Sequence, residues 1–114
     1  MSPTIILKDG KPVYALGSPG GSSIIPYVAT TIIGLVDWKM DVQQAVAQPH
    51  LHNRFGVYEL EAGTPAVEMA DDLAALGYET KVNDQNSGLH GIALGPDGLS
   101  GGADPRREGA ALGD

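Results

Sequence analysis

The sequence predicts an α+β domain in which helices are layered on a largely antiparallel sheet. Three observations lead to this class. An Asp-Gly pair near each end of the chain suits a tight hairpin between antiparallel strands. Between the two pairs, apolar residues recur at helical spacing in three places. No repeat or linker divides the 114 residues, so we expect a single domain over residues 1–114.

The N-terminal part is predicted to be a hairpin followed by a loop. Residues 4–7 are apolar, and residues 13–16 form the expected return strand, with Asp9 and Gly10 in the turn between them. Residues 17–23 then hold three glycines in seven positions. This composition predicts a loop that leaves the second strand.

Two helices are predicted to follow this loop. Apolar side chains within residues 24–36 are spaced near a helical period, and we expect the hydroxyl of Ser22 or Ser23 to cap this helix. A second, shorter helix is expected to begin at Asp41. It should stop before Pro49, because proline disfavours the helical conformation of the residue that precedes it.

A third helix and the remaining strands complete the predicted order. Thr64 and Pro65 form a usual helix start, a capping hydroxyl followed by a first-turn proline, and Gly77 is expected to end the helix. Further strands are expected at residues 56–61, 78–82, 89–94 and 99–102. The predicted total is about six strands and three helices.

The composition excludes several classes of protein. A formal charge of −7 argues against nonspecific nucleic-acid binding and against attraction to anionic membranes, so we expect neither partner. Cysteine is absent, which excludes disulfides, thiolate metal sites and a cysteine nucleophile. No apolar run approaches the roughly 18 residues of a membrane span, and the first residues lack the features of a signal peptide.

The loop at residues 17–23 is the most informative candidate site. Glycine lets a ligand approach the backbone closely, and a following helix N-terminus adds partial positive charge. Such a loop can bind an anion or hold a developing oxyanion with two backbone N–H groups. It lacks both the Gly-Lys-Ser/Thr of a Walker loop and the glycine spacing of a dinucleotide site. A tight strand-to-helix connection with no ligand is the alternative interpretation.

A metal site at the histidines is less strongly indicated than an anion site at the glycine loop. His50 and His52 would face one side of a strand, as metal ligands do, but no third ligand stands at an obvious spacing. The other interpretation is a pair of loop or surface histidines beside Pro49, and we assign no metal and no cofactor. His90 lies in a predicted strand and is expected to be a structural histidine with satisfied hydrogen bonds.

A charged cluster, Asp-Pro-Arg-Arg-Glu at residues 104–108, stands near the C-terminal end. Its arginines could bind a carboxylate in a bidentate fork. We favour the simpler interpretation, in which ion pairs hold this tail to another part of the molecule. No Ser-His-Asp triad can be assigned, because triads are recognised by geometry and not by spacing.

Three motifs together resemble the γ-glutamyltransferase (glutathione hydrolase) family. They are Met-Ser-Pro-Thr-Ile at residues 1–5, Gly-Ser-Pro-Gly-Gly-Ser at residues 17–22, and Gly-Gly-Ala-Asp-Pro-Arg-Arg-Glu-Gly-Ala-Ala at residues 101–111. Their order and separation are similar to the last part of that family's small subunit. The resemblance covers essentially the whole chain.

The resemblance implies an N-terminal-nucleophile hydrolase with an αββα sandwich. In that family the precursor cuts itself into a large and a small subunit, and the new N-terminal threonine attacks a γ-glutamyl amide. Water or an acceptor amine then resolves the γ-glutamyl-enzyme. Backbone N–H groups of the glycines after the proline hold the oxyanion, which places this role at Gly20 and Gly21. Ser18 and Pro19 would shape the loop.

The family's threonine nucleophile matches no residue of this chain, and neither does the serine pair that precedes the position of Met1. The resemblance therefore implies a C-terminal fragment that is inactive alone. Its partners would be the rest of the small subunit and the large subunit, and the parent would act on γ-glutamyl compounds such as glutathione. Bacterial members are commonly exported, which implies a periplasmic or extracellular location, although this chain shows no export signal.

Separation from such partners would leave unpaired strand edges and exposed apolar surface, so we expect the isolated chain to self-associate. One alternative is a stand-alone, non-catalytic binding or structural domain that retains the fold. Another is an anion-binding module unrelated to this family, which the tail motif argues against.

Overall fold

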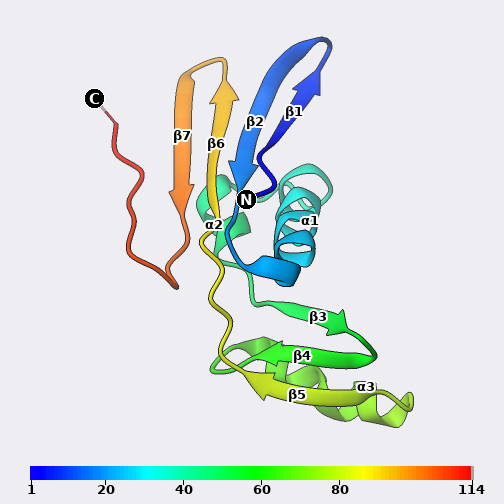
Figure 1. Ribbon diagram of the computed structural model, residues 1–114. Coiled ribbons are helices and arrows are strands. Elements are labelled where there is room, and N and C mark those ends of the chain that lie inside the picture. Colours follow the sequence, from blue (N-terminus) through cyan, green and yellow to red (C-terminus); the bar gives the residue numbers. More distant parts are fainter. Residues whose placement is uncertain (114) are drawn as a thin grey trace. The chain divides into compact units, whose positions relative to one another are not determined.

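The computed structural model describes residues 1–113, which form two compact units (Figure 1). The first unit comprises Met1–Gln48 and Asn86–Asp114, and the second comprises Pro49–Gln85. The secondary structure is α+β, as predicted, with three α-helices and seven strands in the described residues. That is one strand more than the sequence predicted. The single domain over residues 1–114 stays a prediction.

The first unit contains a four-stranded antiparallel sheet in the order β1-β2-β6-β7. Both predicted hairpins are present, between β1 and β2 and between β6 and β7. In the first of them Asp9 and Gly10 have φ of +54° and +78°, the backbone that a two-residue turn requires. The elements of this unit are β1 (Thr4–Lys8), β2 (Lys11–Gly17), the 3-10 turn η1 (Gly21–Ser23), α1 (Ile24–Val36), α2 (Val42–Val46), β6 (His90–Gly95) and β7 (Gly98–Ala103).

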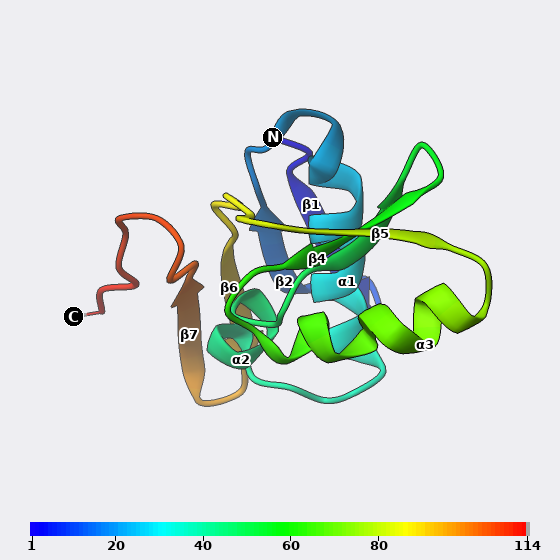
Figure 2. The same cartoon turned by 90° about the horizontal axis from the view of Figure 1, so that it is seen from below.

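Both α-helices of this unit cover one face of its sheet, as the two ribbon views show (Figures 1 and 2). The apolar side chains of α1 and α2 meet those of β2 in the core of the unit. This core consists of Leu16, Tyr27, Val28, Leu35, Val42, Ala45, Val46 and Leu89. Burial of these aliphatic side chains is the main term that holds the helices to the sheet.

The opposite face of the same sheet is apolar and exposed. The register places Ile5, Ala15, Ile92 and Gly101 side by side across the four strands. The side chains of Ile5 and Ile92 are 67% and 47% exposed, and that of Leu99, two residues before Gly101, is 73% exposed. Strands β1 and β7 are the edges of the sheet. A contiguous apolar face of this kind is typical of an interaction surface.

The start of α1 differs from the prediction. Ser23 is the N-terminal cap, but its side chain makes no capping hydrogen bond. The expected hydroxyl cap is wrong because η1 runs directly into α1, so Ser23 already has helical backbone angles (φ −86°, ψ −4°). A side-chain cap needs an extended backbone at that position. Instead the Ser23 backbone N–H donates to the Gly20 carbonyl at 3.1 Å.

Helix α2 begins where the sequence predicts. Asp41 has an extended backbone, and its side chain accepts a hydrogen bond from the Gln44 N–H at 2.7 Å. In return, the Gln44 side-chain oxygen accepts from the Asp41 N–H at 3.2 Å. This reciprocal pair is a capping box, which satisfies two backbone donors that the helix itself leaves without acceptors.

The second unit contains a three-stranded sheet in the order β3-β4-β5. Strands β3 and β4 pair antiparallel, and β4 and β5 pair in parallel. A parallel pair needs a crossover, and here the helical segment between β4 and β5 supplies it. The buried side chains of Leu60, Ala66 and Leu73 come from this sheet and its crossover. The elements are β3 (Leu51–Arg54), β4 (Val57–Glu61), the 3-10 helix η2 (Pro65–Met69), α3 (Ala70–Ala75) and β5 (Glu79–Asn83).

Two predictions are corrected in this unit. Strand β3 was not expected, because its sequence Leu-His-Asn-Arg carries no alternation of apolar and polar residues. The helix expected from Thr64 is divided into a 3-10 segment and a short α-helix. Its predicted cap is confirmed, since the Thr64 hydroxyl accepts from the Ala66 N–H at 3.3 Å. No helix within residues 1–113 is long and apolar enough to cross a membrane.

Candidate functional site

The glycine loop joins β2 to η1 and α1. Gly20 has φ of +139° and Gly21 has φ of +59°, which are values that side chains with a Cβ rarely adopt. A Cβ atom on Gly20 would also lie 2.9 Å from Cε2 of Tyr27, whereas one on Gly21 would meet no atom within 4 Å. Gly20 is therefore pressed against α1, and Gly21 faces open space.

The carbonyl groups of this loop define where its N–H groups point. The Pro19 carbonyl accepts a hydrogen bond from the Ser18 hydroxyl at 2.7 Å, and the Gly20 carbonyl accepts one from the Ser23 N–H at 3.1 Å. All peptide bonds in the described residues are trans, so each N–H points away from the carbonyl of its own peptide. The N–H groups of Gly20 and Gly21 thus lie on peptides whose carbonyls are already engaged. Groups at a helix start have no acceptor inside the helix, and this pair can donate to an anion.

Ser18 connects the loop to two other segments. Its side chain is fully buried, and its backbone N–H donates to the Met1 carbonyl at 3.1 Å. Its hydroxyl oxygen accepts from the Gly88 N–H at 3.2 Å while the hydroxyl donates to the Pro19 carbonyl. Pro19 packs directly on Gly88, where a Cβ atom would lie 2.8 Å from the proline Cγ.

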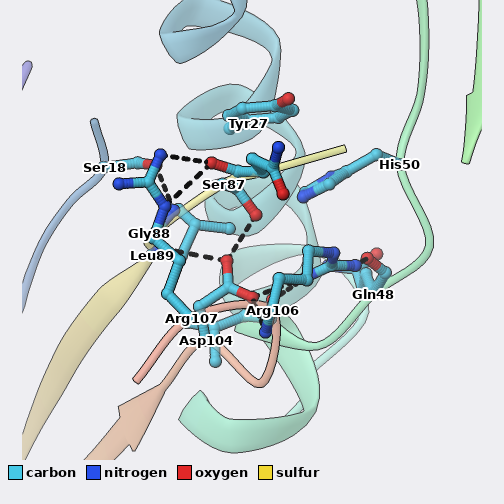
Figure 3. Close-up of polar contacts among 12 residues, drawn as sticks. Ser18, Tyr27, Gln48, His50, Ser87, Gly88, Leu89, Asp104, Arg106 and Arg107 are labelled. Atoms are coloured by element: carbon cyan, nitrogen blue, oxygen red, sulfur yellow. Dashed lines mark hydrogen bonds and ion pairs between the residues drawn. The ribbon is translucent and has the colours of Figure 1, made fainter. Parts of the chain in front are cut away.

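The Asp-Pro-Arg-Arg cluster forms a buried polar network with the segment before β6 (Figure 3). The residue Asp104 is 2% exposed. One of its carboxylate oxygens accepts from the Ser87 hydroxyl and from the Leu89 N–H, the latter at 3.0 Å. The other accepts from the backbone N–H of Arg106 at 3.0 Å and from its guanidinium at 2.9 Å.

This network keeps the Asp104 carboxylate ionised. Burial by itself raises the pKa of an aspartate, because it penalises the charged form. At Asp104 the hydrogen bonds from Ser87, from the N–H groups of Arg106 and Leu89, and from the Arg106 guanidinium more than offset burial, and they hold its pKa below the usual value. Asp104 is therefore ionised at neutral pH, where it pairs with the Arg106 guanidinium.

The two arginines bind mainly backbone carbonyls. Arg106 donates to the carbonyls of Val46 and Gln48 at 3.1 and 2.5 Å. Arg107 donates twice to the Asn86 carbonyl, at 3.1 and 2.8 Å. The tail is therefore held to the rest of its unit, but by hydrogen bonds from the arginines to backbone carbonyls, whereas the prediction was of ion pairs; the ion pair between Arg106 and Asp104 lies within the tail itself. The arginines are oriented toward these carbonyls.

The predicted pair of histidines lies in the second unit. His52 is in β3 and His50 precedes it, and both are buried, so the interpretation as surface residues is wrong. Nε2 of His52 is 3.1 Å from Oε2 of Glu59. Burial lowers the pKa of His52 below its usual value, which the nearby Glu59 only partly counteracts and the charge of Arg54 reinforces. Within residues 1–113 no three His, Cys, Asp or Glu side chains gather as metal ligands.

His90 is the first residue of β6, so its predicted place in a strand is confirmed. Its Nδ1 lies 3.0 Å from the Gly88 carbonyl oxygen. The residue is exposed, and this contact is consistent with the structural histidine that the sequence predicts. Sequence reasoning did not single out Ser87 or Gly88. Their only signal is a Ser-Gly pair directly before a predicted strand.

Comparison with known proteins identifies the family. The profile of the Gamma-glutamyltranspeptidase family matches residues 1–114. This chain belongs to that family. It is 37% identical to the acylase ACY 1 proenzyme of Pseudomonas sp. (strain SE83) over 98% of this chain and 20% of that protein. It is also 37% identical to the glutathione hydrolase proenzyme of Escherichia coli (strain K12) over 93% of this chain and 19% of that protein.

A solved structure gives the same result for the fold. The γ-glutamyltranspeptidase of Pseudomonas nitroreducens, solved in complex with L-DON, superposes with a TM-score of 0.90 at 27% identity. The match covers 100% of this chain and 62% of that one. The α+β fold of an N-terminal-nucleophile hydrolase, which the resemblance implied, is thus confirmed. The chain spans about a fifth of the length of the two curated relatives.

Proposed function

We propose that this chain is the C-terminal part of a γ-glutamyltransferase or glutathione hydrolase, and that Gly20 and Gly21 form its oxyanion hole. The observation that carries the proposal is the backbone of the loop. Two adjacent N–H groups stand at the start of a helical segment, on peptides whose carbonyls are bound by Ser18 and Ser23. Membership of the γ-glutamyltranspeptidase family supports the same role.

The proposed role is electrostatic. When a threonine hydroxyl attacks a γ-glutamyl amide, the electron pair of the carbonyl bond moves onto its oxygen. Two N–H donors stabilise that oxygen more in the transition state than in the bound substrate, which lowers the barrier. A base takes the proton of the threonine hydroxyl, and collapse of the tetrahedral intermediate breaks the C–N bond and expels the amine, which carries that proton away. Water or an acceptor amine then attacks the γ-glutamyl-enzyme, whose carbonyl oxygen occupies the same site.

The attacking threonine lies outside residues 1–114 in this proposal. No threonine of the chain stands at the position that the family uses, so the chain alone should not turn over substrate. The oxyanion loop serves acyl transfer in general, and the relatives include both a glutathione hydrolase proenzyme and an acylase proenzyme. We therefore assign the choice of γ-glutamyl substrate to residues of the parent enzyme outside this loop.

The exposed face of the four-stranded sheet is the proposed contact with the rest of the enzyme. Ile5, Ile92 and Leu99 lie on it, opposite the helices. We propose that the remainder of the small subunit and the large subunit cover this face in the parent. The isolated chain should then self-associate through it. Light scattering at tens of micromolar should show a dimer or larger species, and a monomeric mass would contradict this part of the proposal.

The decisive test is a hybrid enzyme in which residues 1–114 replace the matching stretch of the E. coli glutathione hydrolase proenzyme. The 114-residue chain alone should not hydrolyse γ-glutamyl-p-nitroanilide, whereas the hybrid should mature into two subunits and do so. In the hybrid, Gly20→Ala should lower kcat about 100- to 1,000-fold with little change in KM, because the added Cβ presses on Tyr27 and displaces the backbone N–H, and loss of one oxyanion donor has an effect of this size.

Gly56→Ala controls for the strain of a positive φ, because Gly56 has a φ of +94° and lies in the turn between β3 and β4; unlike Gly20, it has open space around it. Equal, small effects of the two substitutions would contradict an oxyanion role for Gly20. Robust turnover by the pure 114-residue chain would contradict a nucleophile outside it. If instead glutamate shifts the Gly20 and Gly21 amide resonances of a chain that never supports turnover in the hybrid, a stand-alone, non-catalytic binding domain becomes the better description.

A further inference from the structure

We propose that Asp104 is a positioning residue for the glycine loop. Its carboxylate holds Ser87 and Leu89, which places Gly88 against Ser18 and so orients the peptide that carries the Gly20 N–H. The importance of this geometry for catalysis rests on the oxyanion role proposed above. The positioning itself is a separate claim, because it concerns the arrangement of the loop and not its use.

The first step is the set of hydrogen bonds by which Asp104 holds residues 87–89 in place. A single carboxylate oxygen, Oδ2, accepts from the Ser87 hydroxyl and from the Leu89 N–H, which flank Gly88 on either side. The backbone N–H of Asp104 donates back to the Leu89 carbonyl at 2.8 Å. Hydrogen bonds to a buried charged group are the strong ones, so this short segment is held firmly at both ends.

The second step is the contact between Gly88 and the loop. The Gly88 N–H donates to the Ser18 hydroxyl oxygen across 70 positions of sequence. A Cβ atom at Gly88 would lie 2.8 and 3.0 Å from the Cγ and Cδ atoms of Pro19. The absence of a side chain at Gly88 is therefore what allows the two segments to approach. Any displacement of residues 87–89 is transmitted directly to Ser18 and Pro19.

The third step is the direction of the Ser18 hydroxyl hydrogen. A serine hydroxyl has one hydrogen and two lone pairs. Because the Gly88 N–H occupies a lone pair, the hydrogen is left to donate to the Pro19 carbonyl at 2.7 Å. That carbonyl belongs to the same planar peptide as the Gly20 N–H, so the hydroxyl of Ser18 sets the direction of the proposed donor.

The positioning can be tested on the 114-residue chain by amide NMR. Asp104→Asn should shift the Gly20 and Gly88 resonances, and it should accelerate hydrogen exchange of the Gly88 and Leu89 amides, which donate hydrogen bonds, about tenfold. Amides in the distant hairpin between β1 and β2 should stay within twofold of their original exchange rates. Asp97→Asn removes the same charge from an exposed turn and should leave Gly20 and Gly88 unchanged.

A second variant gives the direction of the effect. The contacts run as a relay from Asp104 through residues 87–89 to Ser18 and then to the Pro19–Gly20 peptide. Ser18→Ala should therefore move the Gly20 resonance and leave that of Leu89 in place, because Leu89 lies between Asp104 and Ser18. If Asp104→Asn moves Leu89 but leaves Gly20 unchanged, the positioning role is overturned. Uniform acceleration of exchange throughout the first unit, hairpin included, would equally overturn it and leave Asp104 a purely structural residue.

Activity distinguishes this inference from the proposed function. In the hybrid enzyme Asp104→Asn should lower kcat about 10- to 100-fold with KM within about twofold, since small misplacements of catalytic donors have effects of this size. If the Gly20 resonance responds to Asp104→Asn while Gly20→Ala leaves kcat unchanged, the relay stands and the oxyanion role fails. If Gly20→Ala lowers kcat about 100- to 1,000-fold while Asp104→Asn leaves both kcat and the Gly20 resonance unchanged, the oxyanion role stands and the positioning role fails.

Discussion

Asp104 in the first unit and His52 in the second are both buried, but burial has different consequences for their charge. In the first unit, the carboxylate of Asp104 is kept charged by four hydrogen-bond donors that come from its own tail and from residues 87 and 89. In the second unit, burial favours the neutral form of His52, although Glu59 stands opposite it in the neighbouring strand. The difference teaches that burial alone does not decide the charge of a group. The hydrogen-bonding partners and charges that face the group decide it together with burial.

The two arrangements also differ in the distance along the chain that they bridge. The network of the first unit ties the tail to α2, to the segment before β6 and, through Gly88, to the loop after β2. The polar pairs of the second unit join strands that are neighbours in its sheet, such as His52 with Glu59 and Asn83 with Glu59. We therefore expect changes in the first network to be felt far along the sequence and changes in the second to stay local.

The largest effect is expected from Asp104→Ala. It removes the acceptor of four hydrogen bonds and leaves the mostly buried Arg106 side chain without its carboxylate, which typically costs about 3–5 kcal/mol. The free energy of unfolding of the first unit, measured by hydrogen exchange of its core amides, should fall by that amount. The exposed Asp97→Ala should change it by less than about 0.5 kcal/mol. If Asp104→Ala lowers the free energy of unfolding by less than about 1 kcal/mol, the Asp104 network does not stabilise the first unit in the way proposed.

A second prediction contrasts glycines that the two units need for different reasons. Gly88 needs space, because any Cβ there would press on Pro19, whereas Gly63 has open space and a left-handed φ of +73°. Gly88→Ala should destabilise the first unit by about 1–3 kcal/mol through overpacking. Gly63→Asn should destabilise the second unit by less than about 1 kcal/mol, because asparagine tolerates this backbone. Chemical denaturation checks both values. A larger loss for Gly63→Asn than for Gly88→Ala would contradict the reasons given for the two glycines.

The stability of the two units should depend on pH in different ways. The pKa of His52 is below its usual value of 6.5 in the fold, so the unfolded chain binds the proton first as the pH falls, and the second unit loses stability below about pH 6.5. The slope is at most about 1.4 kcal/mol per pH unit. The pKa of Asp104 is below 3.8 in the fold, so its contribution is complete above that pH and is lost only as the pH falls below it.

Hydrogen exchange at pH 7 and pH 5 should therefore show a weaker second unit and an unchanged first unit. His52→Gln should remove this difference, and His90→Gln, at an exposed position, should not. Equal losses in both units over this interval would contradict the assigned charge states.

The smallest effects are expected at the two capped helix starts. Asp41 takes part in a reciprocal capping box, whereas Thr64 accepts one hydrogen bond at 3.3 Å and donates another to the Glu61 carbonyl at 2.8 Å. Asp41→Ala should lower the free energy of unfolding of the first unit by about 1 kcal/mol. Thr64→Ala should lower that of the second unit by about 0.5 kcal/mol. Thermal denaturation checks this order. A larger effect at Thr64 would contradict the expectation that the reciprocal capping box is the stronger cap.

Local features of the fold could be predicted because local rules produce them. The Asp-Gly turns, the helix start at Asp41 and the cap at Thr64 each depend on a few adjacent residues. The failures have equally local reasons. Strand β3 has no alternating pattern, and the expected hydroxyl cap of α1 is absent because a 3-10 turn runs into the helix.

For the candidate site, the sequence alone determined the residue types that the loop requires and the motifs that mark the family. It also indicated that the charged tail is held to the rest of the molecule. Only the tertiary structure decided what the tail holds, because Ser87 and Asp104 are 17 positions apart and Ser18 and Gly88 are 70 apart. Hydrogen-bond partners at such separations are set by how the sheet and its helices pack, and no local pattern of residues encodes that arrangement.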